Sequence, residues 1–446
     1  MKNSSKKFHI ISLGCSKNLI DSEKIFYQFE KFSFSYTPDP SSADVVVINT
    51  CGFIRDAVEE SIDTILEMGE IKKKKPGMKI VVSGCMVQRY RDQLLSELPE
   101  VDLFVGTTDF YRIPELLDEN KRLHITRPIY KAWEIPRHLL TRPPVGYLKI
   151  AEGCSANCSF CIIPRLRGPQ RSRTVDKLLD EAKWMKDQGV EELIIIAQDT
   201  TAYGRDLDDE TNLTTLLERL KKIEGFRWIR VQYLYPEEYD EEFIELFAEP
   251  PLLPYFDIPI QHFSDTILKR MNRRSDSKTI RNLFKKIKKK IPQSVIRTTV
   301  ITGFPSETDD DFERLTSFLE EDLVDFFGFF KFSPEEEARA SKFPDQIDEE
   351  IKEERAEILS QLAWEKLENF YNKFSGKSVS AIVEEEWDEK YNIGRAWFQG
   401  PDADGSLLIK KTTTPPPFFT EVEVKNEVSE FDGEVMDTTY LSTGTK

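Results

Sequence analysis

The stretch Gly153-Cys-Ser-Ala-Asn-Cys-Ser-Phe-Cys161 carries three cysteines, Cys154, Cys158 and Cys161, at the spacing Cys-x-x-x-Cys-x-x-Cys. Three thiolates this close in sequence can hold three irons of a 4Fe-4S cluster and leave the fourth iron without a protein ligand. A metal with an open position can bind and activate another molecule, whereas fully ligated sites mainly hold structure or carry electrons. These three residues, the loop cysteines, therefore predict an iron–sulfur site that performs chemistry.

Other uses of such a cysteine triplet are zinc binding, disulfide formation and burial as unreactive thiols. A structural zinc site usually has four ligands, and no fourth Cys or His lies nearby in the sequence; the nearest upstream histidine is His138. A chain of 446 residues buries core enough to fold without disulfides. These observations favour the cluster, with zinc and disulfides as the alternatives.

The other three cysteines, Cys15, Cys51 and Cys85, each end an apolar run that is typical of a buried parallel strand. Helical patterns separate these runs, so a βαβα segment with a parallel sheet is expected, and ligands of such sheets bind beyond the carboxyl ends of the strands. Cysteines at three such ends, 36 and 34 residues apart, can converge on one point. These N-terminal cysteines predict a second three-cysteine cluster; three separate buried thiols are the alternative.

From Val145 onward, strands and helices alternate six times, which predicts a partial parallel (β/α)6 barrel. The strands are expected near 147–151, 193–197, 228–234, 256–260, 296–301 and 326–332. Prolines at 128, 136, 143 and 144 indicate a linker before the barrel. Because barrel active sites lie at the carboxyl ends of strands, the loop cysteines, which follow the first strand, are in the expected place.

A long charged helix with an apolar face follows the barrel, and the pattern then changes to short strands. These strands are expected near 379–384, 394–398, 407–410 and 421–424, separated by Gly405 and the Thr-Pro run 412–417. Such spacing is typical of a small antiparallel barrel. The expected fold class is therefore α/β, with an amino-terminal parallel αβα sheet domain, a partial (β/α)6 barrel and a small carboxyl-terminal β-barrel.

The chain resembles the methylthiotransferases, a family of radical S-adenosylmethionine enzymes, and within it the branch that modifies a ribosomal protein. The match spans nearly the whole length and rests on residues 12–23, 49–51, 83–89, 153–164, 167–168, 171–173, 197–204, 256–262 and 297–308. Two positions depart from the usual pattern: Ser16, where proline is common, and Ser306, where glycine is common and tolerates positive φ. Neither is a predicted cluster ligand.

The resemblance implies four segments. They are a methylthiotransferase N-terminal domain with an auxiliary cluster over residues 6–126, a linker over 127–144, a radical S-adenosylmethionine core over 145–373 and a TRAM domain over 374–441. The TRAM domain usually binds the macromolecular substrate.

The resemblance also implies the cofactors and the reaction. Two 4Fe-4S clusters are expected, with S-adenosylmethionine as both methyl donor and radical source. The cluster on the loop cysteines would cleave S-adenosylmethionine to a 5′-deoxyadenosyl radical, which abstracts hydrogen from the β-carbon of one aspartate of small-subunit ribosomal protein S12. The cluster on the N-terminal cysteines would offer its open iron to a sulfide that a second S-adenosylmethionine methylates. No catalytic residue beyond the six cysteines is implied.

Side chains near the strand ends of the barrel are candidates for binding S-adenosylmethionine. They are Phe160 in the cysteine loop, together with Gln198, Gln261, Arg297 and Thr299. Arg297 and Thr299 could instead satisfy hydrogen bonds inside the barrel. His262, also near a strand end, is more typical of a core histidine with its own partners.

Charge bears on the substrate. Residues 374–446 contain seven Lys or Arg and fourteen Asp or Glu, a net charge of −7, and the whole chain carries −17. An acidic surface repels nucleic acid and suits a basic protein such as a ribosomal component. Lys72–Lys75 and Lys285–Lys290 are candidate basic patches, with solvated helix or loop faces as the alternative. Protein S12, free or within the small subunit, is the expected substrate, and nucleic-acid contact is secondary.

Two other functions stay open as alternatives. The same cysteine framework would serve methylthiolation of adenosine in transfer RNA, against which the acidic carboxyl-terminal domain argues. A non-catalytic electron-transfer protein would call for four cysteines per cluster and no barrel.

Composition favours a cytoplasmic protein. The mean hydropathy is −0.46, and the sequence shows neither an apolar run of spanning length nor a signal-peptide core at its amino terminus. Iron–sulfur clusters and free thiols favour a reducing interior. We therefore expect the cytoplasm, no membrane contact, and a reductant such as flavodoxin or ferredoxin.

Overall fold

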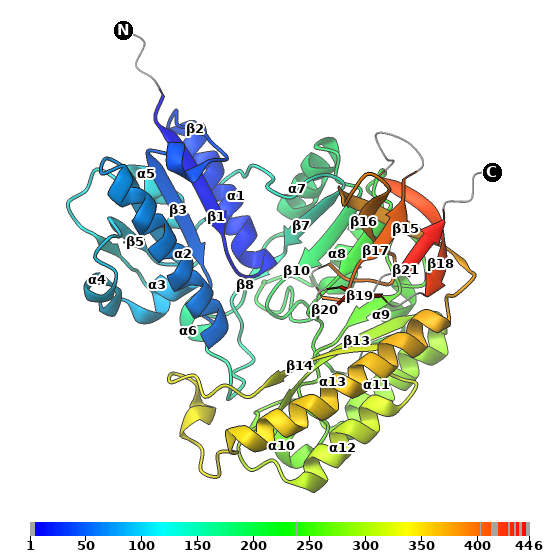
Figure 1. Ribbon diagram of the computed structural model, residues 1–446. Helices are drawn as coiled ribbons and strands as arrows, with labels where there is room; N and C mark the ends of the chain where they lie inside the picture. Colours follow the sequence, from blue (N-terminus) through cyan, green and yellow to red (C-terminus); the bar gives the residue numbers. More distant parts are fainter. Residues whose placement is uncertain are drawn as a thin grey trace.

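The computed structural model describes residues 5–237, 239–401, 403–411, 418–426, 429–431, 434–436 and 439–442. An amino-terminal sheet domain lies beside a partial barrel, and a small closed barrel packs on the far side (Figure 1). Within this described part, no helix combines the length and apolarity needed to cross a membrane. The expected fold class is confirmed.

The amino-terminal domain is built on a six-stranded, fully parallel sheet in the order β2-β1-β3-β4-β5-β6. Its strands are β1 (Lys7–Ser12), β2 (Ser35–Tyr36), β3 (Val45–Thr50), β4 (Lys79–Gly84), β5 (Leu103–Val105) and β6 (Leu123–His124). Its α-helices are α1 (Ser16–Lys31), α2 (Arg55–Lys74), α3 (Cys85–Tyr90), α4 (Gln93–Glu97) and α5 (Ile113–Leu116), and 3-10 turns occupy Pro40–Ser42 and Phe110–Arg112. All six residues of β3 are buried, because helices cover both faces of a parallel sheet.

The second body contains the six parallel strands expected for the partial barrel, in two groups of three ordered β11-β10-β7 and β12-β13-β14. The strands are β7 (Val145–Lys149), β10 (Glu192–Ile196), β11 (Trp228–Val231), β12 (Tyr255–Asp257), β13 (Val295–Thr302) and β14 (Phe326–Lys331), with a short β8–β9 ladder (Ala151–Glu152 and Arg171–Ser172). The helices are α6 (Ile163–Arg167), α7 (Val175–Asp187), α8 (Leu213–Leu220), α9 (Glu241–Leu246), α10 (Asp265–Arg270), α11 (Ser277–Lys290) and α12 (Asp309–Glu320). One continuous apolar core lies between these helices and the strands.

The long helix α13 (Glu349–Asn372) leads into a closed barrel in the order β15-β16-β17-β21-β18 (Figure 1). The strands are β15 (Ser378–Glu386), β16 (Tyr391–Ala396), β17 (Leu407–Lys410), β18 (Phe419–Asn426) and β21 (Thr439–Ser442), with a hairpin of β19 (Ser429–Phe431) and β20 (Glu434–Met436). The sequence indicated the first four but not β21, which closes the barrel. The Thr-Pro run 412–417 lies outside the described residues.

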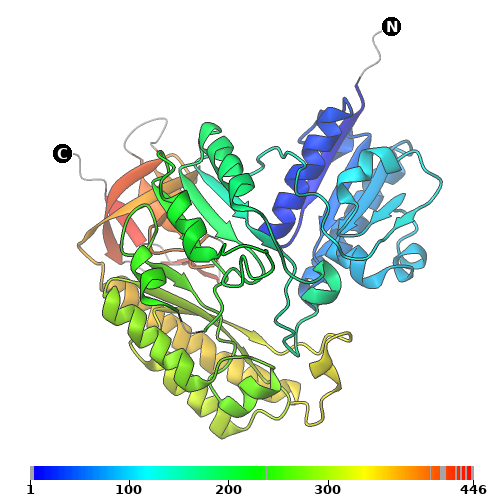
Figure 2. The same cartoon turned by 180° about the vertical axis from the view of Figure 1, so that it is seen from behind.

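The small barrel closes the amino-terminal end of the partial barrel (Figure 2). First residues of the barrel strands, such as Val145, Trp228 and Val295, share one apolar core with residues of β15 to β18. The opposite end, where the barrel strands finish, therefore faces the amino-terminal domain and the cysteines.

Two irregular segments lie between the amino-terminal domain and the partial barrel. Residues 125–144, all of them described, contain no helix or strand and run from β6 to β7. Residues 333–343, here called the strap, follow β14 and contain only the 3-10 turn Arg339–Lys342. The strap lies beneath the amino-terminal sheet, close to α6 (Figure 2).

Candidate functional site: two cysteine triplets

Each N-terminal cysteine lies at the carboxyl end of one of three neighbouring strands, as predicted. Cys15 follows β1 and caps α1, Cys51 follows β3, and Cys85 follows β4 and begins α3. Gly14, with φ of +85°, allows the close approach of the first two loops, because a Cβ atom there would lie 2.8 Å from the Cβ of Cys51. Burial, with smaller contributions from the neighbouring Cys51 and Cys15, raises the pKa of the Cys85 thiol to about 12, although Arg167 acts in the opposite direction. The three residues therefore form one site.

The loop cysteines occupy the turn between β8 and α6, at the carboxyl end of the first barrel strand. Backbone N–H groups of Ala156 and Ile163 donate to the sulfurs of Cys154 and Cys161, each at 3.4 Å. Burial raises the pKa of Cys154 to about 11 and that of Cys161 to about 12, and Cys158 adds to both shifts. The thiols of this turn therefore lie close enough to influence one another's pKa.

Neighbouring segments hold this turn from outside. Asn272 Nδ2 and Arg339 Nη2 donate to the carbonyl of Asn157, at 2.9 and 2.7 Å, and Ala340 N donates to the carbonyl of Ser159 at 2.9 Å. Arg273 Nη1 lies 3.7 Å from the sulfur of Cys158. These contacts hold the loop between the segment that follows α10 and the strap.

All six cysteines are free thiols, and the donor set fits iron–sulfur clusters. Among the described residues, no three Cys, His, Asp or Glu side chains lie close enough to share a single metal ion. The thiolates of one 4Fe-4S cube each bind a different iron and so lie further apart than ligands of one ion. The disulfide alternative does not apply to this structure.

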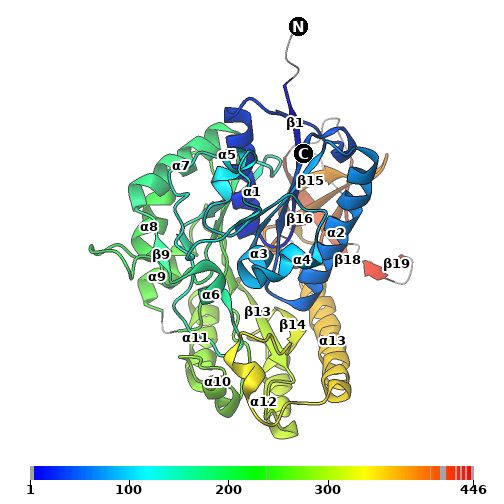
Figure 3. The same cartoon turned by 90° about the vertical axis from the view of Figure 1, so that its left-hand side faces the viewer.

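A buried ion network joins the two sites. Asp21 of α1 accepts hydrogen bonds from Lys149 Nζ of β7 at 2.9 Å and from Arg167 Nη1 of α6 at 2.5 Å. Lys149 also contacts Glu152 at 2.7 Å, and Arg167 Nε lies 3.3 Å from the sulfur of Cys85. Burial alone would raise the pKa of Asp21, but Lys149 and Arg167 outweigh it and lower that pKa. Figure 3 shows α1, α3 and α6 around this junction.

The strap makes a second junction. Arg89 of α3 pairs with Glu335 and Glu337 at 2.7 Å each, and its Nη1 donates to the carbonyl of Gly52 at 3.0 Å. Ala338 packs in one apolar cluster with Cys85, Ile162 and Leu166. Since the strap also bonds to the loop cysteines' turn, it contacts both cysteine sites.

Three of the candidate S-adenosylmethionine contacts lie close to the barrel's carboxyl end. Gln198 donates from Nε2 to Glu152 at 2.5 Å, while its Oε1 is buried without a hydrogen-bond partner among the described residues. Gln261 has φ of +72°, and its backbone bridges to β13 through Thr299 and Ile301. Phe160 packs against the apolar cluster that contains Phe304.

Arg297 and Thr299, the other two candidates, bond to each other and to the protein. Arg297 Nη1 donates to Thr299 at 3.0 Å and to Asp257 at 3.1 Å, and its Nε donates to Asp404 at 2.9 Å. Asp404 belongs to the carboxyl-terminal barrel, so this arginine ties the two bodies together. The roles of all five candidates toward S-adenosylmethionine stay predictions.

Sequence reasoning gave no role to Arg167, Arg89 or Asp21. A buried charge is recognisable only when its partner is known, and each of these partners comes from another domain. His262 is buried and its Nδ1 accepts a hydrogen bond from Ser264 N, while its Nε2 lies 3.4 Å from Glu307 but makes no hydrogen bond within the described residues, so this histidine is only partly partnered.

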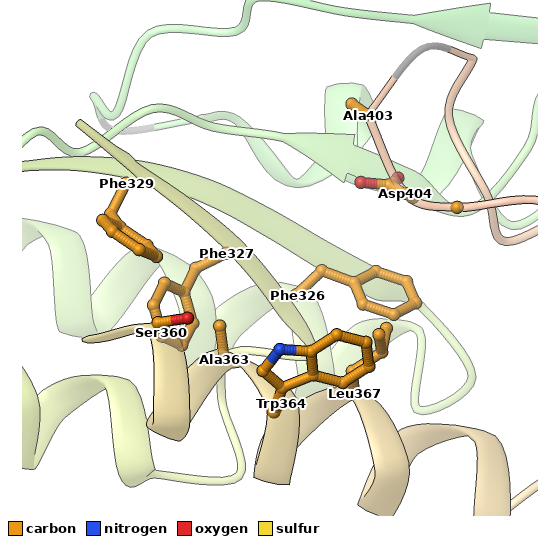
Figure 4. Close-up of a pocket in the computed structure, with 10 residues that line it drawn as sticks. Phe326, Phe327, Phe329, Ser360, Ala363, Trp364, Leu367, Ala403 and Asp404 are labelled. Carbon is orange, nitrogen blue, oxygen red and sulfur yellow. The ribbon is translucent and has the colours of Figure 1, made fainter. Parts of the chain in front are cut away.

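A pocket of about 250 Å³ lies away from the cysteines, between β14, α13 and the loop that carries Asp404 (Figure 4). Phe326, Phe327 and Trp364 form much of its wall. Its lining contains none of the cysteines and none of the candidate S-adenosylmethionine contacts.

Two family models match the chain. The model described as the radical SAM superfamily matches residues 148–319, and the model described as uncharacterized protein family UPF0004 matches residues 7–106. Together they cover the two bodies that carry the six cysteines.

Curated relatives match over nearly the full length. The ribosomal protein uS12 methylthiotransferase RimO of Aquifex aeolicus is 43% identical over 410 residues, 91% of either chain. The protein of that name from Clostridioides difficile is 40% identical over 433 residues, which cover 96% of this chain and 97% of the relative.

Solved structures share the fold at low identity. The radical S-adenosylmethionine methyltransferase TsrM of Kitasatospora setae, with tryptophan and an S-adenosylmethionine analogue bound, has a TM-score of 0.55 at 13% identity and covers 73% of each chain. The cobalamin-dependent S-adenosylmethionine radical enzyme OxsB has a TM-score of 0.51 at 11% identity, over 80% of this chain and 56% of the other.

Proposed function

This chain belongs to the ribosomal protein uS12 methylthiotransferase family, and we propose that it transfers a methylthio group to the β-carbon of an aspartate in that small-subunit protein. The observation that carries the proposal is the pair of three-cysteine sites, one at the carboxyl end of the amino-terminal sheet and one at the carboxyl end of the barrel. Two open iron positions suit a reaction that needs one site to form a radical and another to hold the sulfur.

Each cysteine site would bind its own cluster and have its own role in the reaction. Bound clusters and S-adenosylmethionine supply the radical, the methyl group and an iron position for sulfur. The loop cysteines would hold one cluster, and the N-terminal cysteines the other. Gln198 is suited to orient S-adenosylmethionine, because its free Oε1 can accept one hydrogen bond from a ligand. The strap contacts both cysteine sites through Arg89, Ala338 and Arg339.

Charge supports a protein substrate over transfer RNA. The candidate basic patches are largely neutralised: Lys288 pairs with Asp325 at 2.5 Å, Lys290 with Glu241 and Glu245, and Lys72 with Asp102. The chain as a whole keeps its charge of −17. Such a surface attracts a basic ribosomal protein and repels a polyanion.

The proposal extends to location and partners. A substrate that is part of the ribosome places the enzyme in the cytoplasm, where thiols stay reduced. A small reductant such as flavodoxin or ferredoxin would deliver electrons to the clusters.

The test is a mass measurement on two substrates. The full chain is reconstituted anaerobically with iron and sulfide and incubated with S-adenosylmethionine, dithionite and either purified protein S12 or transfer RNA. We expect S12 to gain the mass of one methylthio group and the RNA to gain nothing. A gain on the RNA alone would contradict the proposed substrate, and formation of 5′-deoxyadenosine without a gain on either would contradict both substrates.

A further inference from the structure

Arg167 reaches from one cysteine site to the other. It is the last residue of α6, the helix that follows the loop cysteines, and its side chain is only 3% exposed. The guanidinium leaves the barrel and enters the amino-terminal domain, where Nε lies 3.3 Å from the sulfur of Cys85. Nη1 donates to Asp21 at 2.5 Å, and Nη2 donates to Asn18 Oδ1. Each nitrogen of the fork thus has its own acceptor.

Within the buried charges around Arg167, its Nε is the donor that faces the sulfur of Cys85. Two carboxylates, Asp21 and Glu152, face two cations, Lys149 and Arg167, so the buried network is balanced without the cysteine. A thiolate bound to iron adds negative charge beside this balanced set. Burying such a charge is costly unless a donor faces it, and Nε of Arg167 is the donor in position.

The carboxylate and the amide fix where that donor points. Asp21 is held by Lys149, and Tyr130 donates to the same carboxylate at 3.1 Å. Asn18 is itself anchored, since its Nδ2 donates to the carbonyl of Thr50 at 2.9 Å. A guanidinium bound through two of its nitrogens cannot rotate, so the third stays directed at the sulfur.

We propose that Arg167 is a positioning residue of the second cluster, donating its Nε–H to the Cys85 thiolate and thereby raising the reduction potential of that cluster. Hydrogen bonds to cluster sulfurs withdraw negative charge and stabilise the reduced form, which carries one more electron. Because Arg167 ends α6, it also connects Cys85 to the helix that follows the loop cysteines. This inference rests on the N-terminal cysteines holding a cluster, as in the proposed function.

The test isolates the second cluster. In a full chain with Cys154, Cys158 and Cys161 all replaced by alanine, only the N-terminal cysteines remain to bind iron. This chain is compared with its Arg167→Gln and Arg167→Lys derivatives. Arg165→Gln is the matched control, because Arg165 is an exposed arginine on the same helix. Iron content and an EPR-monitored potential titration are measured for each.

We expect the midpoint potential to become more negative in Arg167→Gln, to shift less in Arg167→Lys, which keeps the charge, and to stay unchanged in Arg165→Gln. An Arg167→Gln chain that binds about four irons with an unchanged midpoint would overturn the inference. Failure of the parent chain to bind a cluster would overturn the proposed function as well.

A second measurement covers the case in which Arg167→Gln does not fold. The parent chain is grown with arginine carrying ¹⁵N in its guanidinium, and the reduced cluster is studied by pulsed EPR. We expect a ¹⁵N coupling that disappears in Arg167→Lys but persists in Arg165→Gln. Arg89 is a second arginine near this site, because its Nη1 donates to the carbonyl of Gly52, the residue after Cys51. A coupling that is lost in Arg167→Lys therefore comes from Arg167 and not from Arg89. Absence of the coupling in the parent would contradict the hydrogen bond.

Discussion

Cys158 and Cys51 belong to sites with separate tasks, so their replacement should give different defects. Cys158→Ala removes a ligand of the predicted radical-forming cluster, and we expect formation of 5′-deoxyadenosine to stop. Cys51→Ala should leave that formation within about twofold and abolish methylthio transfer to S12, because only the second site is damaged. Both products are measured in one anaerobic assay by mass spectrometry. Cleavage of S-adenosylmethionine at the normal rate by Cys158→Ala would refute the assignment.

Glu181 carries a pH-dependent part of the stability. It pairs with Arg137 at 2.8 Å and Arg173 at 2.6 Å. Burial alone would raise its pKa, but the two arginines outweigh burial and lower the pKa to about 2. A carboxyl group with a depressed folded pKa stabilises the protein above its unfolded pKa, about 4.5, and loses this contribution as the pH falls toward 2.

The prediction is that the wild-type advantage over Glu181→Gln in the free energy of unfolding shrinks by about 2 kcal/mol between pH 6 and pH 3. Urea unfolding of both chains at the two pH values measures the difference. Comparing two chains cancels the titration of groups that they share. An advantage that is equal at both pH values would show that Glu181 is not held ionised by the arginines.

At the residue scale, the sequence predicted the cysteines better than the residues around them. Cysteine spacing is a local property, whereas Arg167 and Glu181 acquire partners only when three segments meet. Ser306, where the family resemblance led us to expect glycine, has φ of +70°, the conformation that glycine favours. The turn therefore keeps its positive φ at residue 306 although the residue is serine.

The turn from β1 to α1 gives a prediction at the scale of an element. Gly14→Ala would place a Cβ atom 2.8 Å from the Cβ of Cys51 and force alanine into φ of +85°. We expect the iron content of the N-terminal site to fall by half or more while 5′-deoxyadenosine still forms. Gly77→Ala is the control, because a Cβ atom there meets nothing within 4 Å. Equal iron content in the two variants would contradict the close approach of Cys15 and Cys51.

Elements with a strong pattern were predictable, and short ones were not. The buried runs in β3 and β4 carry continuous apolar residues, which mark parallel strands, and the six barrel strands expected from the sequence are all present. By contrast, β2 and β6 each contain two residues, and β21 is recognisable only through its pairing with β17 and β18. Their existence depends on partners that the local sequence does not reveal.

At the scale of the whole molecule, the carboxyl-terminal barrel is joined to the partial barrel by buried ion pairs. Arg395 inserts between Glu192 of β10, at 2.6 Å, and Glu384 of its own barrel, at 2.7 Å, and Arg230 shares Glu192. The side chains of Arg395, Glu192 and Arg230 are buried, whereas Glu384 is partly exposed. Neither the charge count nor the strand pattern could predict this, because the pairs cross between bodies that are distant in sequence.

Arg395→Ala should destabilise the entire chain by about 3 kcal/mol, since it breaks a buried pair and leaves Glu192 with one cation instead of two. Chemical denaturation followed by fluorescence measures the loss. Lys410→Ala, an exposed change in the same barrel, is the control and should shift stability by less than about 0.5 kcal/mol. Similar stability of the two variants would mean that the barrel is an independent appendage.

The most direct test of the whole account is the iron bound by three chains after anaerobic reconstitution: the unsubstituted chain, one with Cys15, Cys51 and Cys85 replaced by alanine, and one with Cys154, Cys158 and Cys161 replaced. Two three-cysteine clusters predict about eight irons for the first chain and about four for each of the others, with the Mössbauer spectrum of 4Fe-4S cubes. An unsubstituted chain with about four irons, all of them lost with a single triplet, would contradict the second cluster and with it the proposed transfer.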